Sequence, residues 1–352
     1  MKLSIVILNW NGSHHLKRFL PALIRFSSYD WTEIIVADNH SDDDSCSCIE
    51  NNFPEIKLLK LSRNYGFAEG YNQALKNNFS EYILLLNSDV EVTQNWLEPL
   101  IKIMDSDPLI GSCQPKILSL NQPDKFEYAG ASGGFIDKLG YPFCRGRIIN
   151  VQENDREQYN MPTSVFWTSG AAMMVRGKVW HEYGGFDSDF WAHMEEIDLC
   201  WRMKNQGYKV VINPESKVFH LGGGTLAYGS PQKIYLNFRN NLFLLYKNLP
   251  KGELYKTLFF RMILDGVAAF QFLITGQFKS FVSVLRAHWD FYKSLKKLKS
   301  KREELLVKTL RTTHPEIYQR SIIFDFFIAK KKKFSSLSFP TYDIHGQPFK
   351  VK

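Results

Sequence analysis

A carboxylate that follows a buried apolar run is the first candidate for chemistry. Asp89 ends the sequence Asn87-Ser88-Asp89, directly after residues 83–86, which are all aliphatic. A divalent cation held by this carboxylate could neutralise the charge of a diphosphate leaving group. One carboxylate is a weak metal site, so a second ligand is expected, and His220, before Gly222-Gly223-Gly224, is the best candidate. The alternatives are a helix cap at Asp89 and a buried structural histidine at His220.

Two successive carboxylates, Glu195 and Glu196, form a second candidate site. A glutamate can act as a general base, and neighbouring carboxylates raise one another's proton affinity. Acidic residues are also favoured in the first turn of a helix, and the sequence predicts a helix over residues 195–206. Asp198 and Arg202 are four residues apart and can pair on one face of that helix.

Four apolar segments of the first half are predicted to be parallel strands buried on both faces. They are residues 3–8, 33–37, 56–61 and 82–86. Polar residues follow these strands at Asn9, Asp38, Arg63 and Asp89. Polar residues often follow strands simply because loops are polar. In an open α/β sheet, however, ligands bind outside the carboxyl ends of the strands, so these four side chains are expected to meet at one crevice.

Residues 163–220 are expected to complete the same domain. They include a strand that opens on small residues (169–175) and two short strands (209–213 and 217–220). Residues 130–147, which are rich in glycine and aromatic residues, are interpreted as a long functional loop.

The charge of the chain is divided between its two parts. Residues 231–352 carry 23 Lys and Arg against 8 Asp and Glu, a net charge of +15, whereas residues 1–230 carry −7. Long helical patterns with aromatic residues begin at Pro231. The apolar window 258–285 is interrupted by Arg261, Asp265 and Lys279, and its longest uncharged run is too short to cross a bilayer. This window is expected either to lie in a membrane interface or to form a core helix pair around Gly276.

Seven segments within residues 3–225 occur in an order and with a spacing that resemble a known family. They are SIVILNWNG (4–12), ADNHSDD (37–43), RNYGFAEGYN (63–72), LLLNSDVEV (84–92), TSGAAMMVR (168–176), GGFDSDFWAHMEEIDLCWR (184–202) and HLGGGT (220–225). The sequence resembles glycosyltransferase family 2, the inverting GT-A transferases, especially the rhamnosyltransferase-like branch of bacterial surface-polysaccharide enzymes.

The resemblance implies the GT-A nucleotide-diphospho-sugar transferase fold, an α/β fold with an open, mostly parallel sheet. It implies transfer of a sugar from dTDP-rhamnose or a UDP-sugar to a glycan or a lipid-linked glycan. Asp38 would read the pyrimidine base, and the same nucleotide pocket would include Asn9, Arg63, Asn64 and Ser88.

The resemblance also implies roles at the reacting centre. Asp89 and His220 would hold Mg²⁺ or Mn²⁺ and support the diphosphate. Glu196 stands where the family usually has its aspartate base, and Glu195 is the alternative base. The loop that receives donor and acceptor would include Trp167, Ser169, Gly170, Asp198 and Arg202.

Three domains are expected: a catalytic domain (1–230), a basic helical extension (231–330) and a peripheral tail (331–352). Five scattered cysteines and a poor signal peptide favour a cytoplasmic protein, and the +15 extension is expected to contact the anionic inner face of the cell membrane. Nucleic-acid binding is not expected.

Other functions fit the sequence less well. A dehydrogenase would need G-x-G-x-x-G after the first strand, which is missing. A nucleotidyltransferase should have a Gly-rich phosphate loop with a lysine near the N-terminus, and a catalytically inactive membrane-bound scaffold need not keep the set Asp38, Asp89, Glu196 and His220.

Overall fold

The central sheet contains eleven strands in the computed structural model, which describes residues 1–222 and 229–349. In order across the sheet they are β16 (Pro348–Phe349), β15 (Thr341–Asp343), β11 (Thr163–Ser164), β13 (Lys209–His220), β6 (Ile110–Ser119), β12 (Ala172–Arg176), β4 (Tyr82–Leu86), β1 (Leu3–Asn9), β2 (Thr32–Asp38) and β3 (Lys57–Lys60), with β5 (Val90–Val92) paired to β13. β1 pairs in parallel with β2 and β4, as do β2 with β3 and β6 with β13. The predicted open, mostly parallel α/β sheet is confirmed.

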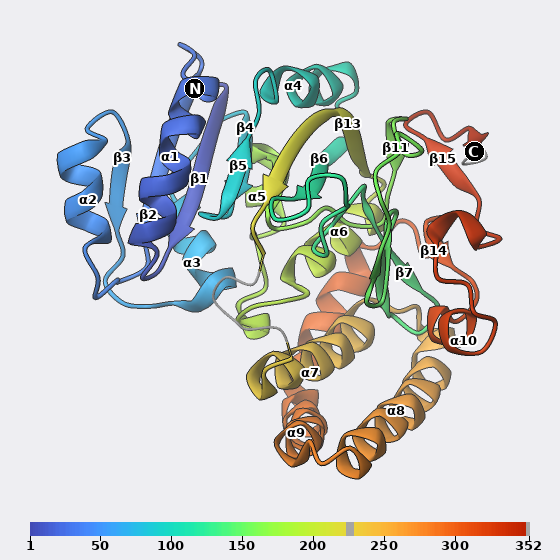
Figure 1. Cartoon of the computed structure of the whole chain (residues 1–352). Helices are drawn as coiled ribbons and strands as arrows, with labels where there is room; N and C mark the ends of the chain where they lie inside the picture. The colour runs from blue at the N-terminus through green and yellow to red at the C-terminus, as the bar shows by residue number, and fades with distance from the viewer. Residues whose placement is uncertain (223–228, 350–352) are drawn as a thin grey trace.

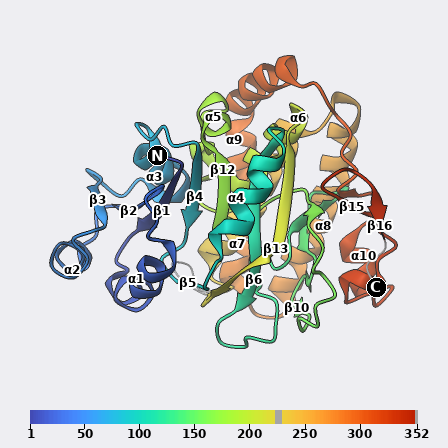
Figure 2. The ribbon, with the colours of Figure 1, turned by 90° about the horizontal axis from the view of Figure 1, so that it is seen from above.

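Helices cover both faces of this sheet (Figures 1 and 2). One face packs against α1 (Ser13–Ser27), α2 (Ser45–Asn52) and α4 (Leu97–Ser106), and the other against α3 (Gly66–Leu75), α5 (Gly177–Glu182) and α6 (Glu195–Asn205). In β1, Ile5 and Ile7 point to the first face and Val6 to the second. Because successive side chains of a strand alternate, burial on both faces explains the continuous apolar runs of the sequence.

The C-terminal part is helical, as expected. It consists of α7 (Pro231–Asn248), α8 (Lys251–Ile274), α9 (Phe278–Lys308) and the short α10 (Ile322–Phe327). Figure 1 shows α7, α8 and α9 below the sheet, on the side to which the carboxyl ends of β1 and β2 point. α8 and α9 form a helix pair joined at Gly276, whose φ of 74° suits a tight turn. β15 and β16, from residues 331–352, lie at the far edge of the sheet.

The sequence did not predict β6, which is the second longest strand of the sheet; only β13 is longer. Its polar side chains Ser112, Gln114 and Lys116 are fully buried, which hides the apolar pattern of a central strand. Partners far along the chain satisfy them: Ser112 contacts Thr168 at 2.7 Å, and Lys116 forms an ion pair with Asp155 at 2.8 Å. The two short strands expected before His220 are one strand, β13, with a break in register between Asn213 and Lys217.

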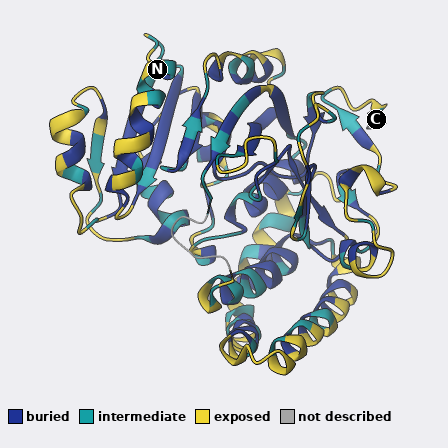
Figure 3. Cartoon of the chain, viewed as in Figure 1, coloured by how far each residue is buried: buried dark blue, intermediate teal, exposed yellow. Residues whose placement is uncertain are grey.

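The prediction of a long loop over residues 130–147 is wrong, because the segment forms strands. β7 (Gly134–Asp137), β8 (Pro142–Cys144) and β9 (Arg147–Ile148) join β10 (Val151–Gln152) and β14 (Ile317–Tyr318) in a second, five-stranded sheet. Its glycines allow close packing rather than a mobile loop, since a Cβ on Gly134 would overlap the Trp167 indole. Figure 3 shows this region as largely buried.

Candidate active site

Asn9 and Asp38 end adjacent parallel strands and form the first part of the site. They are paired in register, and Asp38 Oδ1 accepts hydrogen bonds from Asn9 Nδ2 at 3.1 Å and from Ser41 Oγ at 2.6 Å. A Cβ on Gly12 would overlap Asn9 Oδ1 and would lie 3.7 Å from Ser88 Oγ, which brings Ser88 to the same place. Asn9 Oδ1 is buried and lacks a hydrogen-bond partner among the described residues, so it is available to a ligand.

Arg63 and Asn64 follow β3 at the edge of this cluster. Asn64 Oδ1 accepts hydrogen bonds from the Gly66 amide at 2.8 Å and from Asn39 Nδ2 at 3.1 Å, which fixes the start of α3. The Arg63 guanidinium is exposed and lies 4.7 Å from the centre of the Tyr65 ring. The structure therefore gives Asn64 a role in shaping the loop and leaves Arg63 accessible to an anion.

The structure brings the expected metal residues, Asp89 and His220, together. β5 follows Asp89 directly, and its antiparallel pairing places Val90 opposite His220. His220 Nε2 lies 3.0 Å from Asp89 Oδ1, and both side chains are buried. Asp89 is followed by a strand, so it does not cap a helix. Residues 223–225 of the segment after His220 lie outside the described residues.

Glu127 is the third member of this cluster, and no sequence pattern pointed to it. Its Oε2 lies 3.4 Å from His220 Nδ1. Burial lowers the pKa of His220, but the adjacent Asp89 and Glu127 carboxylates outweigh burial and raise the pKa to about 10. Between these carboxylates the imidazole is therefore a cation at neutral pH.

Asp89 and His220 could together bind a divalent cation that a bound substrate also coordinates. Their facing atoms are close enough to bind one ion, once the imidazole has lost its proton. Among residues 1–222 and 229–349, no group of three or more His, Cys, Asp or Glu side chains has the arrangement of a metal site. The protein would thus supply few ligands and the diphosphate and water the rest, which is the usual mode of Mg²⁺ binding with phosphates.

The segment with Trp167, Ser169 and Gly170 lies beside the Asp89 loop. The Asn87 amide donates to the Ala171 carbonyl oxygen at 3.0 Å. Trp167 is buried and donates from Nε1 to a backbone carbonyl in β7, and Ser169 Oγ donates to the Ala129 carbonyl oxygen at 2.9 Å. These two side chains hold neighbouring segments together, whereas a Cβ on Gly170 would make ordinary contact with the Phe67 ring of α3 at 3.5 Å.

Glu195 and Glu196 begin α6 after a strained loop. Trp191, His193 and Met194 all have φ between 62° and 74°, a left-handed conformation that is uncommon for residues other than glycine. The Trp191 carbonyl oxygen accepts from the first amides of α3, those of Phe67 and Ala68, at 2.9 and 3.0 Å. Backbone strain of this kind persists only where the surroundings hold it, and it is frequent in active sites.

The two glutamates differ in exposure. Glu195 is only 3% exposed, whereas Glu196 is partly exposed. Burial raises the pKa of Glu196 to about 7. Burial and then the Glu196 charge raise the pKa of Glu195 well above its usual value. Burial therefore favours the neutral form of Glu195, and Glu196 can exchange a proton with a bound molecule.

α7 holds the strained loop from outside the expected catalytic domain. Asn240 Nδ2 donates to the carbonyl oxygens of Phe190 at 2.9 Å, Ala192 at 2.8 Å and His193 at 2.7 Å. The neighbouring Arg239 Nη2 donates to the carbonyl oxygens of Asp189 and Phe190, both at 3.0 Å. No local pattern predicts these residues, because their partners are main-chain atoms almost 50 positions away.

Asp198 and Arg202 support α6 from within. Their expected pair forms, with Arg202 Nε 2.8 Å from Asp198 Oδ2. Lys247 and Asn248 of α7 also donate to Asp198 Oδ1, each at 2.9 Å. Arg202 donates to two carbonyl oxygens of the Tyr183–Gly185 turn. Asp198 is fully buried, so the structure places this pair in the core beneath the site.

Several basic residues of the C-terminal helices form ion pairs with aspartates of the loop before α6. Lys301 lies 2.6 Å from Asp187 and 2.7 Å from Asp189, Lys247 also pairs with Asp187, and Lys297 also pairs with Asp189. The acidic loop before α6 and the basic helices therefore neutralise one another, and only the remaining cations are available to an external partner.

Comparisons with known proteins identify a matching family and relatives of this chain. The model of the family described as Glycosyl transferase family 2 matches residues 4–179. An N-acetylglucosaminyl-diphospho-decaprenol L-rhamnosyltransferase of Mycobacterium tuberculosis is 25% identical over 237 residues, which cover 62% of this chain and 75% of the relative.

Two solved structures have a similar arrangement of elements. Residues 1–349 of S. aureus TarS in complex with UDP-GlcNAc align over 99% of both chains, with 14% identity and a TM-score of 0.54. GalNAc-T7 with UDP, GalNAc and Mn²⁺ aligns over 70% of this chain and 48% of its own, with 18% identity and a TM-score of 0.56. At these identities the likeness shows the fold.

Proposed function

Because the chain belongs to glycosyltransferase family 2, we propose that it transfers a sugar, with inversion, from a nucleotide-diphosphate donor to a glycan acceptor. It has the GT-A fold that the sequence motifs predict and is an enzyme of the glycosyltransferase class. We propose three features of its reaction: the sugar donor, the acceptor and the inversion of configuration.

The observation that carries this proposal is that Tyr71 connects the segments of two kinds of carboxylate: its Oη donates to the Leu86 carbonyl oxygen of β4 at 3.3 Å, and burial and then the Glu195 charge raise its pKa. Asp89, beside His220, follows β4, and the segment before β12 links it to the Trp167–Gly170 side of the site. Glu196, with a pKa of about 7, begins α6. A donor bound through its diphosphate at the first group would present its anomeric carbon to an acceptor at the second.

In this mechanism Glu196 Oε accepts the proton of the acceptor hydroxyl as the hydroxyl oxygen attacks the anomeric carbon. The bond to the diphosphate breaks on the opposite face of the sugar, so the configuration inverts. Asn9, Asp38 and Ser88 orient the nucleotide. Asp89 and His220 would hold Mg²⁺ or Mn²⁺, which supplies charge neutralisation for the diphosphate when bound.

We propose dTDP-rhamnose or a UDP-sugar as the donor and a lipid-linked glycan of cell-surface polysaccharide synthesis as the acceptor. The name of the M. tuberculosis relative supports the rhamnose and the lipid-linked acceptor, and the UDP complexes support a pyrimidine nucleotide. Such an enzyme would work from the cytoplasm at the inner face of the membrane. Residues 1–230 would form the catalytic domain, residues 231–330 the extension and residues 331–352 a tail.

A donor screen tests the proposal. Thermal shift and donor hydrolysis are measured with dTDP-, UDP- and GDP-sugars, each with Mg²⁺ or Mn²⁺, for the wild type and for Asp89→Ala. Stabilisation by one pyrimidine sugar nucleotide, absent in the variant, is expected. NMR of the transferred product then gives the anomeric configuration, and retention instead of inversion would contradict the mechanism.

A further inference from the structure

The outer surface of α8 and α9 is unusually apolar for a surface in water. Eight large apolar side chains of α8 and five of the first half of α9 are between 41% and 78% exposed. The five on α9 are Phe278, Val282, Leu285, Trp289 and Tyr292. Their spacing of four and three residues places them along one stripe of the helix. We call these thirteen side chains the α8–α9 face. An exposed apolar surface of this extent marks an interaction site.

The charged residues that interrupt the apolar sequence of α8 do not interrupt this face. Arg261 and Asp265 are buried, with Arg261 Nε 2.7 Å from Asp265 Oδ1. Arg261 also donates to Asn241 of α7, and His288 Nε2 of α9 lies 3.2 Å from Asp265 Oδ2. Both charges therefore point inward, and no exposed residue between Lys256 and Lys279 is charged.

Basic residues border the face, and exposed acidic residues are missing from it. Lys279, Arg286 and Lys293 are exposed and spaced seven apart, so they form a second stripe of α9 next to the apolar one. Between Leu254 and Arg302 the acidic residues are the buried Asp265 and Asp290, which is only partly exposed and accepts a hydrogen bond from Tyr235.

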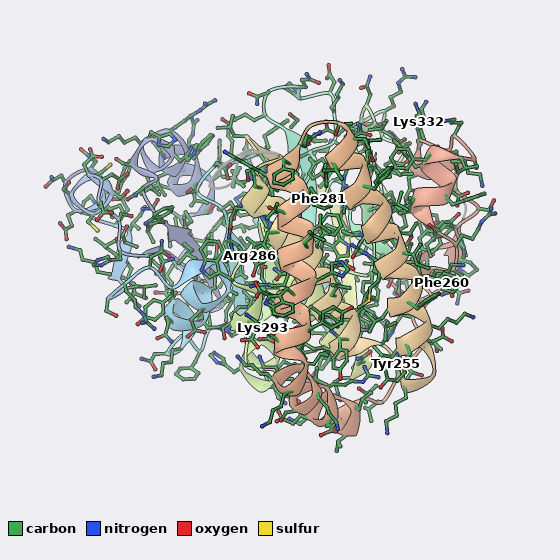
Figure 4. The ribbon with its side chains drawn as sticks, turned by 90° about the horizontal axis from the view of Figure 1, so that it is seen from below. Tyr255, Phe260, Phe281, Arg286, Lys293 and Lys332 are labelled. Atoms are coloured by element: carbon green, nitrogen blue, oxygen red, sulfur yellow. The ribbon has the colours of Figure 1, made fainter. Side chains whose placement is uncertain are left out.

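Figure 4 shows α8 and α9 side by side on the underside of the molecule, with Tyr255 and Phe260 on α8 and Arg286 and Lys293 on α9. The short α10 lies on the same side, next to the labelled Lys332. α10 and the residue after it expose Phe324, Phe327 and Ile328, and lysines follow at residues 330–333. The combination of apolar and basic residues thus continues beyond the two long helices.

We propose that the α8–α9 face docks in the plane of an anionic phospholipid bilayer, with its apolar side chains in the acyl boundary and its basic border at the headgroups. An apolar stripe flanked by Lys and Arg is the pattern of a helix that lies in a membrane interface. Trp289, Tyr292 and Tyr255 have amphipathic rings that suit the headgroup level. The face carries net positive charge, which complements anionic lipid.

The other side of α8 argues for docking rather than for crossing the bilayer. α8 is long and apolar enough to span a membrane by length and composition. However, its inner side packs on α7 and α9 through the Arg261–Asp265–His288 cluster and the buried Leu254, Leu258 and Ala269. A helix with one face in protein and one face apolar and exposed fits a molecule that lies on the membrane.

Docking on this face would bring the active site to its acceptor. α7 lies between the face and the site, and Figure 1 shows α7, α8 and α9 on the side to which the carboxyl ends of β1 and β2 point. This consequence rests on the proposed lipid-linked acceptor, whereas the docking itself does not depend on it.

Binding to vesicles of phosphatidylcholine with or without phosphatidylglycerol tests the docking. The full chain is expected to sediment with anionic vesicles at low salt. Lys279→Glu/Arg286→Glu/Lys293→Glu should weaken binding by a hundredfold or more, at about fivefold for each lost cation. The matched control Lys76→Glu/Lys102→Glu/Lys178→Glu changes the same charge at exposed lysines directly after α3 and within α4 and α5, and it should weaken binding far less.

The apolar part of the face has its own test. Trp289 fluorescence should be quenched by lipids with brominated acyl chains, and the quenching should largely disappear in Trp289→Phe. Phe270→Ser should weaken vesicle binding, whereas Phe79→Ser, at an 80% exposed phenylalanine elsewhere, should not. Binding that is unchanged in the triple variant and in Phe270→Ser would overturn the proposal. The proposal would also be overturned if the wild type bound no vesicles and instead formed a dimer that Phe270→Ser converted to a monomer.

Donor hydrolysis separates this proposal from the proposed function. Face variants should hydrolyse the donor in solution like the wild type and lose transfer only to an acceptor embedded in vesicles. A protein that hydrolyses the donor but ignores anionic vesicles contradicts the docking alone. A protein that binds vesicles but neither binds nor hydrolyses any sugar nucleotide contradicts the proposed function alone.

Discussion

The side-chain amide of Asn240 donates to the carbonyl oxygen of His193 at 2.7 Å, two residues before Glu195. The same nitrogen reaches the carbonyl oxygens of Phe190 and Ala192. Three main-chain atoms of a strained loop thus depend on one side chain of α7. Asn240 is a positioning residue, because it would act on the reaction only through the placement of Glu196.

Replacing Asn240 with Ala should lower kcat by about tenfold to a hundredfold and leave the KM for the donor nearly unchanged. The buried carbonyls would lose their donor, at a cost of about 1–3 kcal/mol in the free energy of unfolding. Asn241→Ala is the matched control, since Asn241 is equally buried but donates to the Gly140 carbonyl oxygen, between β7 and β8, and accepts from Arg261 of α8. Equal losses of kcat in both variants would mean that Asn240 only stabilises the fold.

Glu196→Gln should reduce transfer by about a hundredfold or more, because a general base typically contributes that much or more. Glu195→Gln should change transfer only a few-fold, because burial favours the neutral form of Glu195 and Gln resembles the neutral acid. Steady-state kinetics of both variants, with donor affinity from thermal shift, make the comparison. The reverse order of effects would move the base to Glu195.

The transfer rate should rise with pH through about pH 7, because only ionised Glu196 accepts a proton. Stability should change in the opposite direction. The pKa of Glu196 is higher in the folded protein than in the unfolded chain, so the folded state binds the proton more tightly, and the contribution of Glu196 to stability falls as pH rises through about 7. The melting temperature of Glu196→Gln relative to the wild type should therefore increase between about pH 5 and pH 8. A rate profile that is flat across pH 7 would contradict this assignment.

EDTA should abolish transfer, and Mn²⁺ or Mg²⁺ should restore it in the wild type. Asp89→Ala should lower transfer by about a thousandfold, a loss of several kcal/mol of charge stabilisation, and added metal should not restore it. Asp105→Ala removes a carboxylate that pairs with Lys2 near the surface and should have little effect. Transfer that continues in EDTA would exclude the proposed metal at Asp89.

Asp198→Ala should destabilise the fold by about 3–5 kcal/mol, because it leaves Arg202 and Lys247 buried without their carboxylate. Urea unfolding measures the change. Asp44→Ala is the control, since the exposed Asp44–Lys17 pair should contribute less than about 1 kcal/mol. Similar effects of the two substitutions would show that the buried pairs do not hold the extension to α6.

The sequence predicted what short stretches of chain determine by themselves. The parallel strands follow from apolar runs that are buried on both faces, and Asp89 and His220 meet because each lies at the end of a strand in the same sheet. The helix of Glu195 and Glu196 follows from local periodicity and ends as expected before Gly207.

Features that depend on distant partners could not be predicted. β6 escaped detection because its polar side chains are satisfied by residues such as Thr168 and Asp155. Glu127 and Asn240 reach the site from segments with no motif of their own. The net charge of the extension suggested that all its basic residues face an external partner. Lys247, Lys297 and Lys301 instead each pair with an aspartate in or near α6.

The loop that leads into Glu195 and Glu196 is held by residues that follow it in the chain by 47 to 114 positions, which limits the modularity of this enzyme. A C-terminal extension exchanged with that of a relative would bring a new membrane surface but would remove Asn240, Lys247 and Lys301 from their partners. The acidic loop and the basic helices should therefore be inherited together, and chimeras should keep activity only when both are taken from the same parent.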